Sequence, residues 1–234
     1  GLLLPGLVDL HAHPGSGNSK YGINPDAHLL TRGVTTVLSQ GDAGATNWER
    51  YRKEIVEASQ TRVLLAINLA APGESRPHGC CEDLEDVDVD ACIRAIEAWR
   101  NGIWGVSVNT SVMACGKTNP DEVLSRGLAV AEATGLLILF GSRRHPDRSL
   151  PAQLERLRAG DVVTYCFHEK GELVHDGRVR DEVWAAQARG VIFDVGHGGS
   201  SFSFEVAEAA LADEFFPDTI SSDQYLHHVG SVPQ

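Results

Sequence analysis

Long apolar runs and export signals are missing from this 234-residue sequence. No apolar run reaches the roughly 18 residues that a membrane-spanning helix needs. The first residues, GLLLPGLVDL, lack the basic flank and the small-residue cleavage site of a secretory signal peptide. We therefore predict a cytoplasmic protein that does not span a membrane.

Basic residues and cysteines are also scarce. The chain has 20 Lys and Arg against 32 Asp and Glu, a formal net charge of -12. Nucleic acids and anionic membrane surfaces select basic patches, so we expect neither as a partner. The five cysteines are odd in number and lack zinc-ribbon spacing, which favours reduced thiols over disulfides.

Short apolar runs alternate with amphipathic stretches along the whole chain. Eight runs read as strands: 6–13, 34–42, 62–70, 102–109, 135–142, 161–168, 190–197 and 218–224. Helical patterns lie between them at 47–59, 88–99, 119–135, 149–160, 180–190 and 203–213. Asn47, Asp88, Asn119 and Ser149 read as N-caps, and Gly135, Gly160 and Gly190 as helix stops.

This alternation predicts an α/β fold with a parallel sheet. Eight strands joined by helices fit a (β/α)8 TIM barrel, whereas a doubly wound sheet has fewer strands and a glycine-rich first turn. Neither GxGxxG nor GxxxxGK[ST] occurs. We expect one domain over residues 1–234, in which 42% of the residues are hydrophobic.

Catalytic residues of such barrels lie where strands end, so the polar residues at the run ends are candidates. They are His11, His13, Gln40, Asp42, Asn68, Ser107, Asn109, Ser142, Tyr165, Cys166, His168, Asp194, His197, Ser221, Ser222 and Asp223. Alternate side chains of a strand share a face, so His11 and His13 point into the same space while Ala12 points away. Two converging imidazoles suit a divalent cation, with zinc expected first.

Several of these segments resemble a known family. The motif PGLVDLHAH resembles the first strand of the amidohydrolase superfamily, which are metal-dependent hydrolases that include dihydroorotases, deacetylases and aminoacylases. The segments GVTTVLSQGDAGATNW, GDVVTYCFH, GVIFDVGHGGSSFSFEVAEAAL and PDTISSDQ resemble its deacetylase-like and acyl-mandelate esterase-like branch. The resemblance implies that Asp223, at the end of the eighth strand, binds metal and shuttles the proton.

Three positions depart from the family pattern. Ser107 stands where the family has a bridging lysine, and Leu139 and Tyr165 stand where it has the histidines of strands five and six. The resemblance then implies a mononuclear site held by His11, His13, Asp223 and His197 in place of a binuclear one. His168, Cys166 and His145 lie close enough in the sequence to be substitutes, although Cys166 more readily reads as core.

A second group of residues is placed to contact a substrate. Arg143 and Arg144 follow the fifth strand, where a guanidinium could clamp a carboxylate, although ion pairing with loop acids is the alternative. Asn109 and Asp42 lie at strand ends, and His168 belongs to the site or its rim. His197, between glycines, either binds metal or substrate or hydrogen-bonds a neighbouring loop.

These features predict a metal-dependent hydrolase that cleaves an amide, cyclic amide or ester of a small polar molecule through a metal-bound hydroxide, with Asp223 as the general base. The alternative is a non-catalytic barrel with a degenerate metal site, favoured by the three replaced positions. A serine or cysteine nucleophile has little support, since no GxSxG motif occurs. The chain lacks the family's usual accessory β-sandwich and the last barrel helix, so we expect part of a longer chain or a reduced form, and a homo-oligomer.

Overall fold

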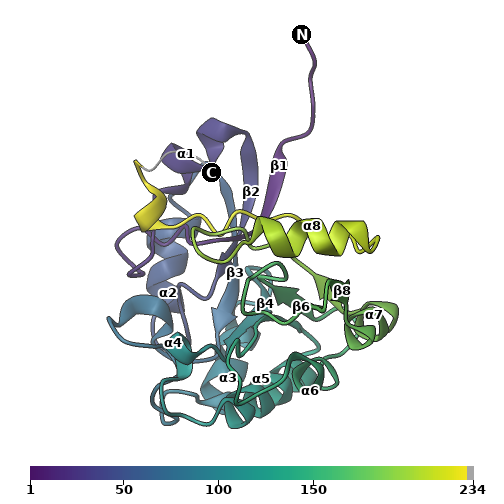
Figure 1. Ribbon diagram of the computed structural model, residues 1–234. Coiled ribbons are helices and arrows are strands. Elements are labelled where there is room, and N and C mark those ends of the chain that lie inside the picture. Colours follow the sequence, from purple (N-terminus) through teal and green to yellow (C-terminus); the bar gives the residue numbers. More distant parts are fainter. Residues whose placement is uncertain (231–234) are drawn as a thin grey trace.

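The computed structural model describes residues 1–230, so the last four residues of the predicted domain lie outside the described part. A curled parallel sheet of seven strands forms its centre, with helices packed on its outer face (Figure 1). The strands, in spatial order, are β1 (Leu7–Ala12), β2 (Val34–Gln40), β3 (Arg62–Asn68), β4 (Ile103–Asn109), β5 (Leu137–Gly141), β6 (Val162–Thr164) and β9 (Ile192–Phe193). The predicted α/β class and parallel sheet are confirmed.

Within residues 1–230, each of the six predicted helical segments contains a helix, with different lengths, and the two short helices at 25–28 and 112–115 were not predicted. They are α1 (Pro25–His28), α2 (Trp48–Tyr51), α3 (Val89–Ala98), α4 (Val112–Cys115), α5 (Pro120–Thr134), α6 (Leu150–Leu154), α7 (Asp181–Ala188) and α8 (Phe204–Ala212). A short antiparallel hairpin, β7 (Val174–His175) and β8 (Arg178–Val179), was not predicted. No helix in residues 1–230 is long and apolar enough to cross a membrane.

Capping explains most helix starts. Side chains of Asp88, Asn119 and Ser149 accept hydrogen bonds from backbone N–H groups in the first turns of α3, α5 and α6, as predicted. Asn47 is at the predicted N-cap position of α2, but its side chain accepts a hydrogen bond from the Gly44 N–H and not from the first turn of the helix. The helix it precedes is correspondingly short, and it continues as a π-helical turn over Arg52–Val56.

Apolar side chains fill both faces of the sheet. The larger cluster lies between sheet and helices and includes Ala12, Ile67 and Phe140. A smaller cluster of Ala66, Leu139 and Val162 fills the opposite, concave face. Strand residues alternate between the two faces, as pleating requires.

The predicted eighth strand, residues 218–224, forms no regular strand. Two isolated parallel bridges, Asp194 to Thr219 and Ala12 to Gln224, join this segment to both edges of the sheet. Side-chain bonds replace part of the ladder, since Asp9 accepts hydrogen bonds from the backbone N–H and the hydroxyl of Ser222. Within residues 1–230, the curled sheet therefore has seven regular strands, and a complete eight-stranded barrel remains a prediction.

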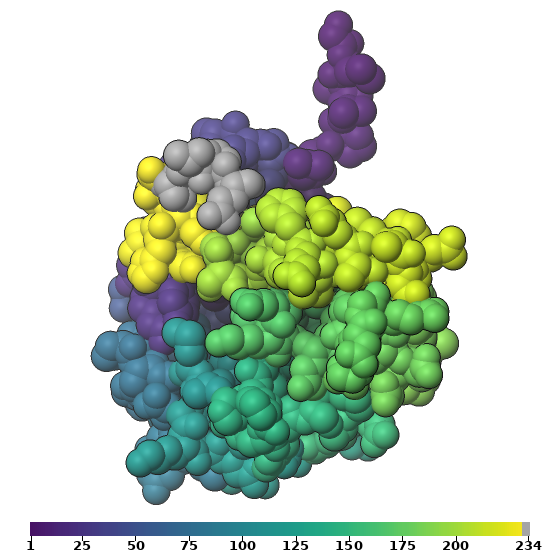
Figure 2. Space-filling model, in the orientation of Figure 1, coloured from purple at the N-terminus to yellow at the C-terminus, as the bar shows by residue number. Residues whose placement is uncertain are grey.

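The first residues of the chain extend away from this body (Figure 2). Leu2, Leu3 and Leu4 are at least 71% exposed. They contribute nothing to the core, which begins with the inner half of β1.

Candidate metal centre

His11 and His13 lie at the end of β1 and point to the concave side of the sheet. Both are buried, and Ala12 between them packs into the core on the helix side, as strand alternation predicts. The His13 N–H donates to the carbonyl of Gln224, at 2.9 Å, and the Asp223 N–H donates to the carbonyl of His11, at 2.8 Å. These two bonds bring the closing segment, residues 218–224, directly beside the two histidines.

Asp223 completes a cluster of three potential ligands. Its Oδ1 lies 3.2 Å from His11 Nε2 and 3.5 Å from His13 Nε2. One ligand atom from each residue falls within 4.8 Å of the others, and all three residues are buried. Asp223 has a left-handed backbone (φ 46°), and Gly198 packs so closely that a Cβ there would lie 2.6 Å from Asp223 Oδ2.

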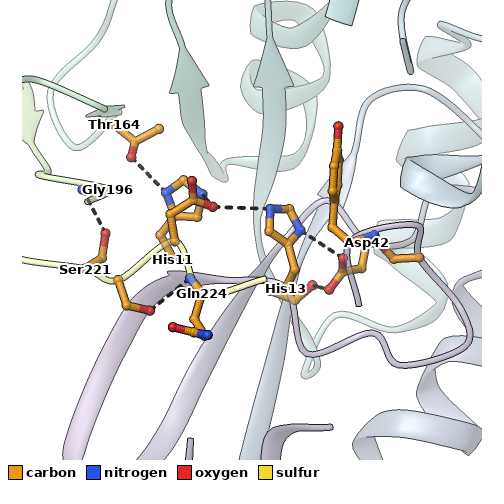
Figure 3. Close-up of polar contacts among 12 residues, drawn as sticks. His11, His13, Asp42, Thr164, Gly196, Ser221 and Gln224 are labelled. Carbon is orange, nitrogen blue, oxygen red and sulfur yellow. Dashed lines mark hydrogen bonds and ion pairs between the residues drawn. The ribbon is translucent and has the colours of Figure 1, made fainter. Parts of the chain in front are cut away.

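Each imidazole is held from its other side. His13 Nδ1 lies 3.0 Å from Asp42 Oδ1, and His11 Nδ1 lies 2.8 Å from the hydroxyl of Thr164. Asp42 is itself fixed by the Ser39 hydroxyl and the Gly15 N–H. Figure 3 shows Thr164 and Asp42 on the outer sides of the two rings. Both Nε2 atoms are thereby directed toward Asp223, the arrangement in which histidine binds a cation.

Charge within the cluster is balanced by ion pairing. Burial disfavours the ionised Asp223 carboxylate, but the imidazoles of His11 and His13 outweigh it and hold the pKa of Asp223 below its usual value. Burial likewise opposes charge on His13, but Asp42 and Asp223 raise the pKa of His13 to about 10. The two carboxylates thus create a site that favours positive charge between them.

The donor set fits a divalent cation. Two imidazole nitrogens and one carboxylate oxygen converge, and three protein ligands with one open position are typical of catalytic zinc. Among residues 1–230, no other group of three His, Cys, Asp or Glu side chains converges in this way.

A cavity of about 600 Å³ opens onto this cluster. Tyr21 and Tyr225 form one wall, with ring centroids 5.2 Å and 6.2 Å from that of His13. Its lining residues are His13, Lys20, Tyr21, Gln40, Glu74, Pro77, Gly79, Cys80, Ser107, Asn109, Ser111, Met113, Ala114, Arg144, Tyr165, His168, Ser200, Ser201, Asp223, Tyr225 and His227. The site can therefore accept a small polar molecule beside the three ligands.

Proteins with related sequences are named deacetylases. One from Brucella anthropi is 33% identical over 228 residues, which cover 95% of this chain and 56% of the relative. One from Agrobacterium fabrum is 33% identical over 228 residues, covering 95% and 55%. One from Enterococcus faecalis is 30% identical over 234 residues, covering 97% and 62%. The chain thus spans little more than half the length of these curated relatives.

Solved structures give the same picture. An adenine deaminase has a TM-score of 0.87 at 27% identity, covering 96% of this chain and 61% of that one. A dihydroorotase has a TM-score of 0.86 at 31% identity, covering 96% and 63%. No protein-family model matches the chain. The chain resembles the amidohydrolase superfamily in sequence and in fold.

The three positions at which this amidohydrolase-like chain departs from the family pattern all lie near the three potential ligands or beneath them. Ser107 lines the cavity, and Leu139 is fully buried in the apolar cluster on the concave face of the sheet. The Tyr165 hydroxyl lies 3.2 Å from His11 Nε2, and its backbone is left-handed (φ 64°). None of these three side chains offers the histidine or lysine donor expected for a second cation.

The predicted substrate-binding residues separate into two groups. Asn109, Arg144 and His168 line the cavity. Arg144 lies over the ring of Tyr165, 4.7 Å from its centroid, and its buried Nη1 has no hydrogen-bond partner in the described part of the chain. Arg143 instead forms a bidentate ion pair with Asp147, the alternative that the sequence left open.

Two other predicted residues face away from the cavity. Asp42 lies behind His13 and orients its ring, so its geometry does not favour direct contact with a substrate. His197 donates from Nδ1 to the Gly198 carbonyl and stacks on Phe202, with ring centroids 4.6 Å apart. It lies outside the cluster of three ligands. Cys166 is buried in the core.

Sequence reasoning missed several residues of the site. Thr164 was not considered, although it is the last residue of β6 and its neighbour Tyr165 stands where the family has the metal-binding histidine of strand six. Tyr21 and Tyr225 lie in irregular segments, where strand periodicity gives no signal. Asp194 was noted only as a strand-end residue, and its hydrogen bonds to residues of other segments cannot be read from its own neighbours in the sequence.

Proposed function

We propose that the protein is a metal-dependent hydrolase that cleaves an amide, cyclic amide or ester bond of a small polar molecule. The observation that carries the proposal is the convergence of His11 Nε2, His13 Nε2 and Asp223 Oδ1 at one end of a 600 Å³ cavity. Relatives named deacetylase, adenine deaminase and dihydroorotase support hydrolytic chemistry. We further propose that residues 218–224 take the place of an eighth strand and complete a barrel around this site.

His11, His13 and Asp223 would hold one divalent cation, with zinc expected first because imidazole and carboxylate ligands suit it. Such a cation lowers the pKa of a bound water and polarises a substrate carbonyl. The replacement of three donor positions by Ser107, Leu139 and Tyr165 supports a mononuclear site.

Asp223 would act as the general base. The carboxylate is ionised at neutral pH and lies beside the proposed cation, where it would accept a proton from the attacking water and return it to the leaving group. Tyr165 and Arg144 face the same cavity. Among the described residues, 1–230, none forms an ion pair with the guanidinium of Arg144, so an anionic group of the substrate would relieve the cost of its buried charge.

Metal content tests this proposal directly. Protein purified without chelator should carry about one zinc per chain by plasma mass spectrometry. A His11→Ala, His13→Ala double variant should carry none, while a His28→Ala, His175→Ala control, altered outside the cavity, should keep the metal. The metal-loaded protein is then screened against N-acyl and O-acyl compounds. Two zinc ions per chain would contradict the mononuclear site.

The second candidate is a non-catalytic barrel that keeps its histidines as a relic. The three replaced donor positions favour it, because a binuclear mechanism cannot operate without them. Absence of bound metal, together with no turnover of any acyl compound, would support this candidate over the hydrolase. Location in the cytoplasm, a small-molecule partner and homo-oligomer assembly remain predictions from the sequence.

A further inference from the structure

Asp194 is a buried carboxylate that three hydroxyl groups surround. Its Oδ2 accepts hydrogen bonds from Thr164, at 2.9 Å, and from Ser221, at 2.6 Å. Its Oδ1 accepts one from Thr219, at 2.7 Å. The side chain is fully buried and does not line the cavity, and its Oδ2 lies 3.9 Å from His11 Nδ1.

One of these hydroxyls sets the orientation of His11. A hydroxyl has one proton, and that of Thr164 is donated to Asp194. Thr164 must then accept from His11 Nδ1, 2.8 Å away, which places a ring proton on Nδ1 and makes Nε2 the ring atom that faces Asp223. Gly196 makes room for this contact, since a Cβ at that position would lie 2.2 Å from the Thr164 hydroxyl.

The other two hydroxyls hold the segment that carries Asp223. Thr219 and Ser221 belong to the closing segment, which has only isolated bridges to its neighbours. Ser221 also accepts from the Gly196 N–H, at 3.1 Å, and its carbonyl accepts from the His197 N–H. Asp223 follows two residues later, so its position depends on how this segment is fixed.

We propose that Asp194 is a positioning residue that acts on two of the three metal ligands at once, on His11 through Thr164 and on Asp223 through Ser221. The inference rests on the proposed metal site. Asp42 orients His13 by direct contact with its ring. Replacement of groups that orient a metal-binding histidine typically weakens metal affinity by about 10- to 100-fold.

Zinc affinity of the full chain, measured by competition with a chromogenic chelator, provides the test. Asp194→Asn and Thr164→Val should each weaken zinc binding by about 10- to 100-fold, and Thr164→Ser, which keeps the hydroxyl, should restore it. Ser221→Ala removes only the hydrogen bond that joins Asp194 to the closing segment, and it should weaken zinc binding by a smaller factor. Asp161→Asn is the matched control, because Asp161 is also fully buried and accepts several hydrogen bonds, from Ile138 and Arg158, away from the cluster.

The comparison with Asp161→Asn separates positioning from a merely structural role. If Asp194→Asn and Asp161→Asn leave zinc affinity equally unchanged, Asp194 only supports the fold and the proposal is overturned. Nitrogen-15 NMR of the metal-free protein gives an independent readout: His11 should carry its proton on Nδ1 in the wild type and lose that preference in Thr164→Val. Failure of the wild type to bind zinc would refute the proposed function, while the tautomer of His11 would still decide the role of Asp194.

Discussion

The two halves of the sheet position the site by different means. Strands β1 to β5 are five to seven residues long and form parallel ladders, with register shifts in the β1–β2 and β3–β4 pairs. Strands β6 and β9 have three and two residues, and the closing segment has only isolated bridges. His11 and His13 come from the regular half, whereas Asp223 and Tyr165 come from the irregular half.

Backbone conformation follows the same division. Tyr165 and Asp223 both have positive φ angles, which a regular strand does not allow. Hydrogen bonds of side chains, from Ser222 to Asp9 and from Ser221 to Asp194, there supplement the backbone bonds of the closing segment. The irregular half can thus place a carboxylate above the end of β1, but its geometry depends on individual hydroxyl groups.

Removal of the proposed base in the irregular half should give the largest effect. Asp223→Asn should lower kcat/KM for any acyl substrate found by about 100- to 10,000-fold, because a positioned base contributes about that much. Asp176→Asn is the control, since Asp176 has nearly the same backbone (φ 48°) but is exposed on the hairpin. Retention of activity in Asp223→Asn would exclude the proposed role of Asp223.

A core substitution tests the regular half. Leu139→Ala should lower the free energy of unfolding by about 2–5 kcal/mol, because it leaves a cavity in a tightly packed interior. Urea unfolding measures the change. Leu211→Ala, on the outer face of α8 where the side chain is 46% exposed, should change the free energy by less than about 0.5 kcal/mol. Equal effects would mean that the concave cluster contributes little to stability.

Sequence patterns predicted the regular half well because its signals are local. Alternation in β1 correctly placed Ala12 opposite to His11 and His13. Glycine at 135 ends α5 in a left-handed conformation, as predicted, and three of four predicted N-caps have the expected side-chain bond. The resemblance to amidohydrolases was visible in the same short motifs.

The irregular half was predicted less well because its structure depends on contacts between distant segments. Residues 218–224 show the apolar and polar pattern of a strand end, yet they form only two isolated bridges, and their hydroxyl groups donate to Asp9 and Asp194 in distant segments. Arg143 and Arg144 are neighbours of the same type, and only the folded chain shows that one pairs with Asp147 while the other lines the cavity.

Substitution of Asp42 shows how much the regular half contributes to zinc affinity relative to the irregular half. Asp42→Asn should weaken zinc binding by about 10- to 100-fold, since it removes the carboxylate that orients His13. The effect should exceed that of Ser221→Ala, because Asp42 contacts a ligand directly. Chelator competition on both variants measures this order. A larger effect of Ser221→Ala would show that the closing segment dominates metal affinity.

The smallest expected effect concerns pH and lies at His168, just beyond β6. Burial lowers the pKa of His168 to about 4, and the positive charges of Arg144 and Lys170 add to the shift. The Lys170 N–H also donates to His168 Nδ1, at 2.9 Å, which favours the neutral ring. Because the unfolded chain takes up this proton near pH 6.5 and the folded chain only near pH 4, the free energy of unfolding should fall as pH drops between these values and stay level above them.

NMR titration of the His168 ring should show a midpoint near 4 that rises in Arg144→Gln, and His168→Gln should lose less stability than the wild type between pH 7 and pH 5. A midpoint near 6.5 in the wild type would mean that this end of the cavity is open to water.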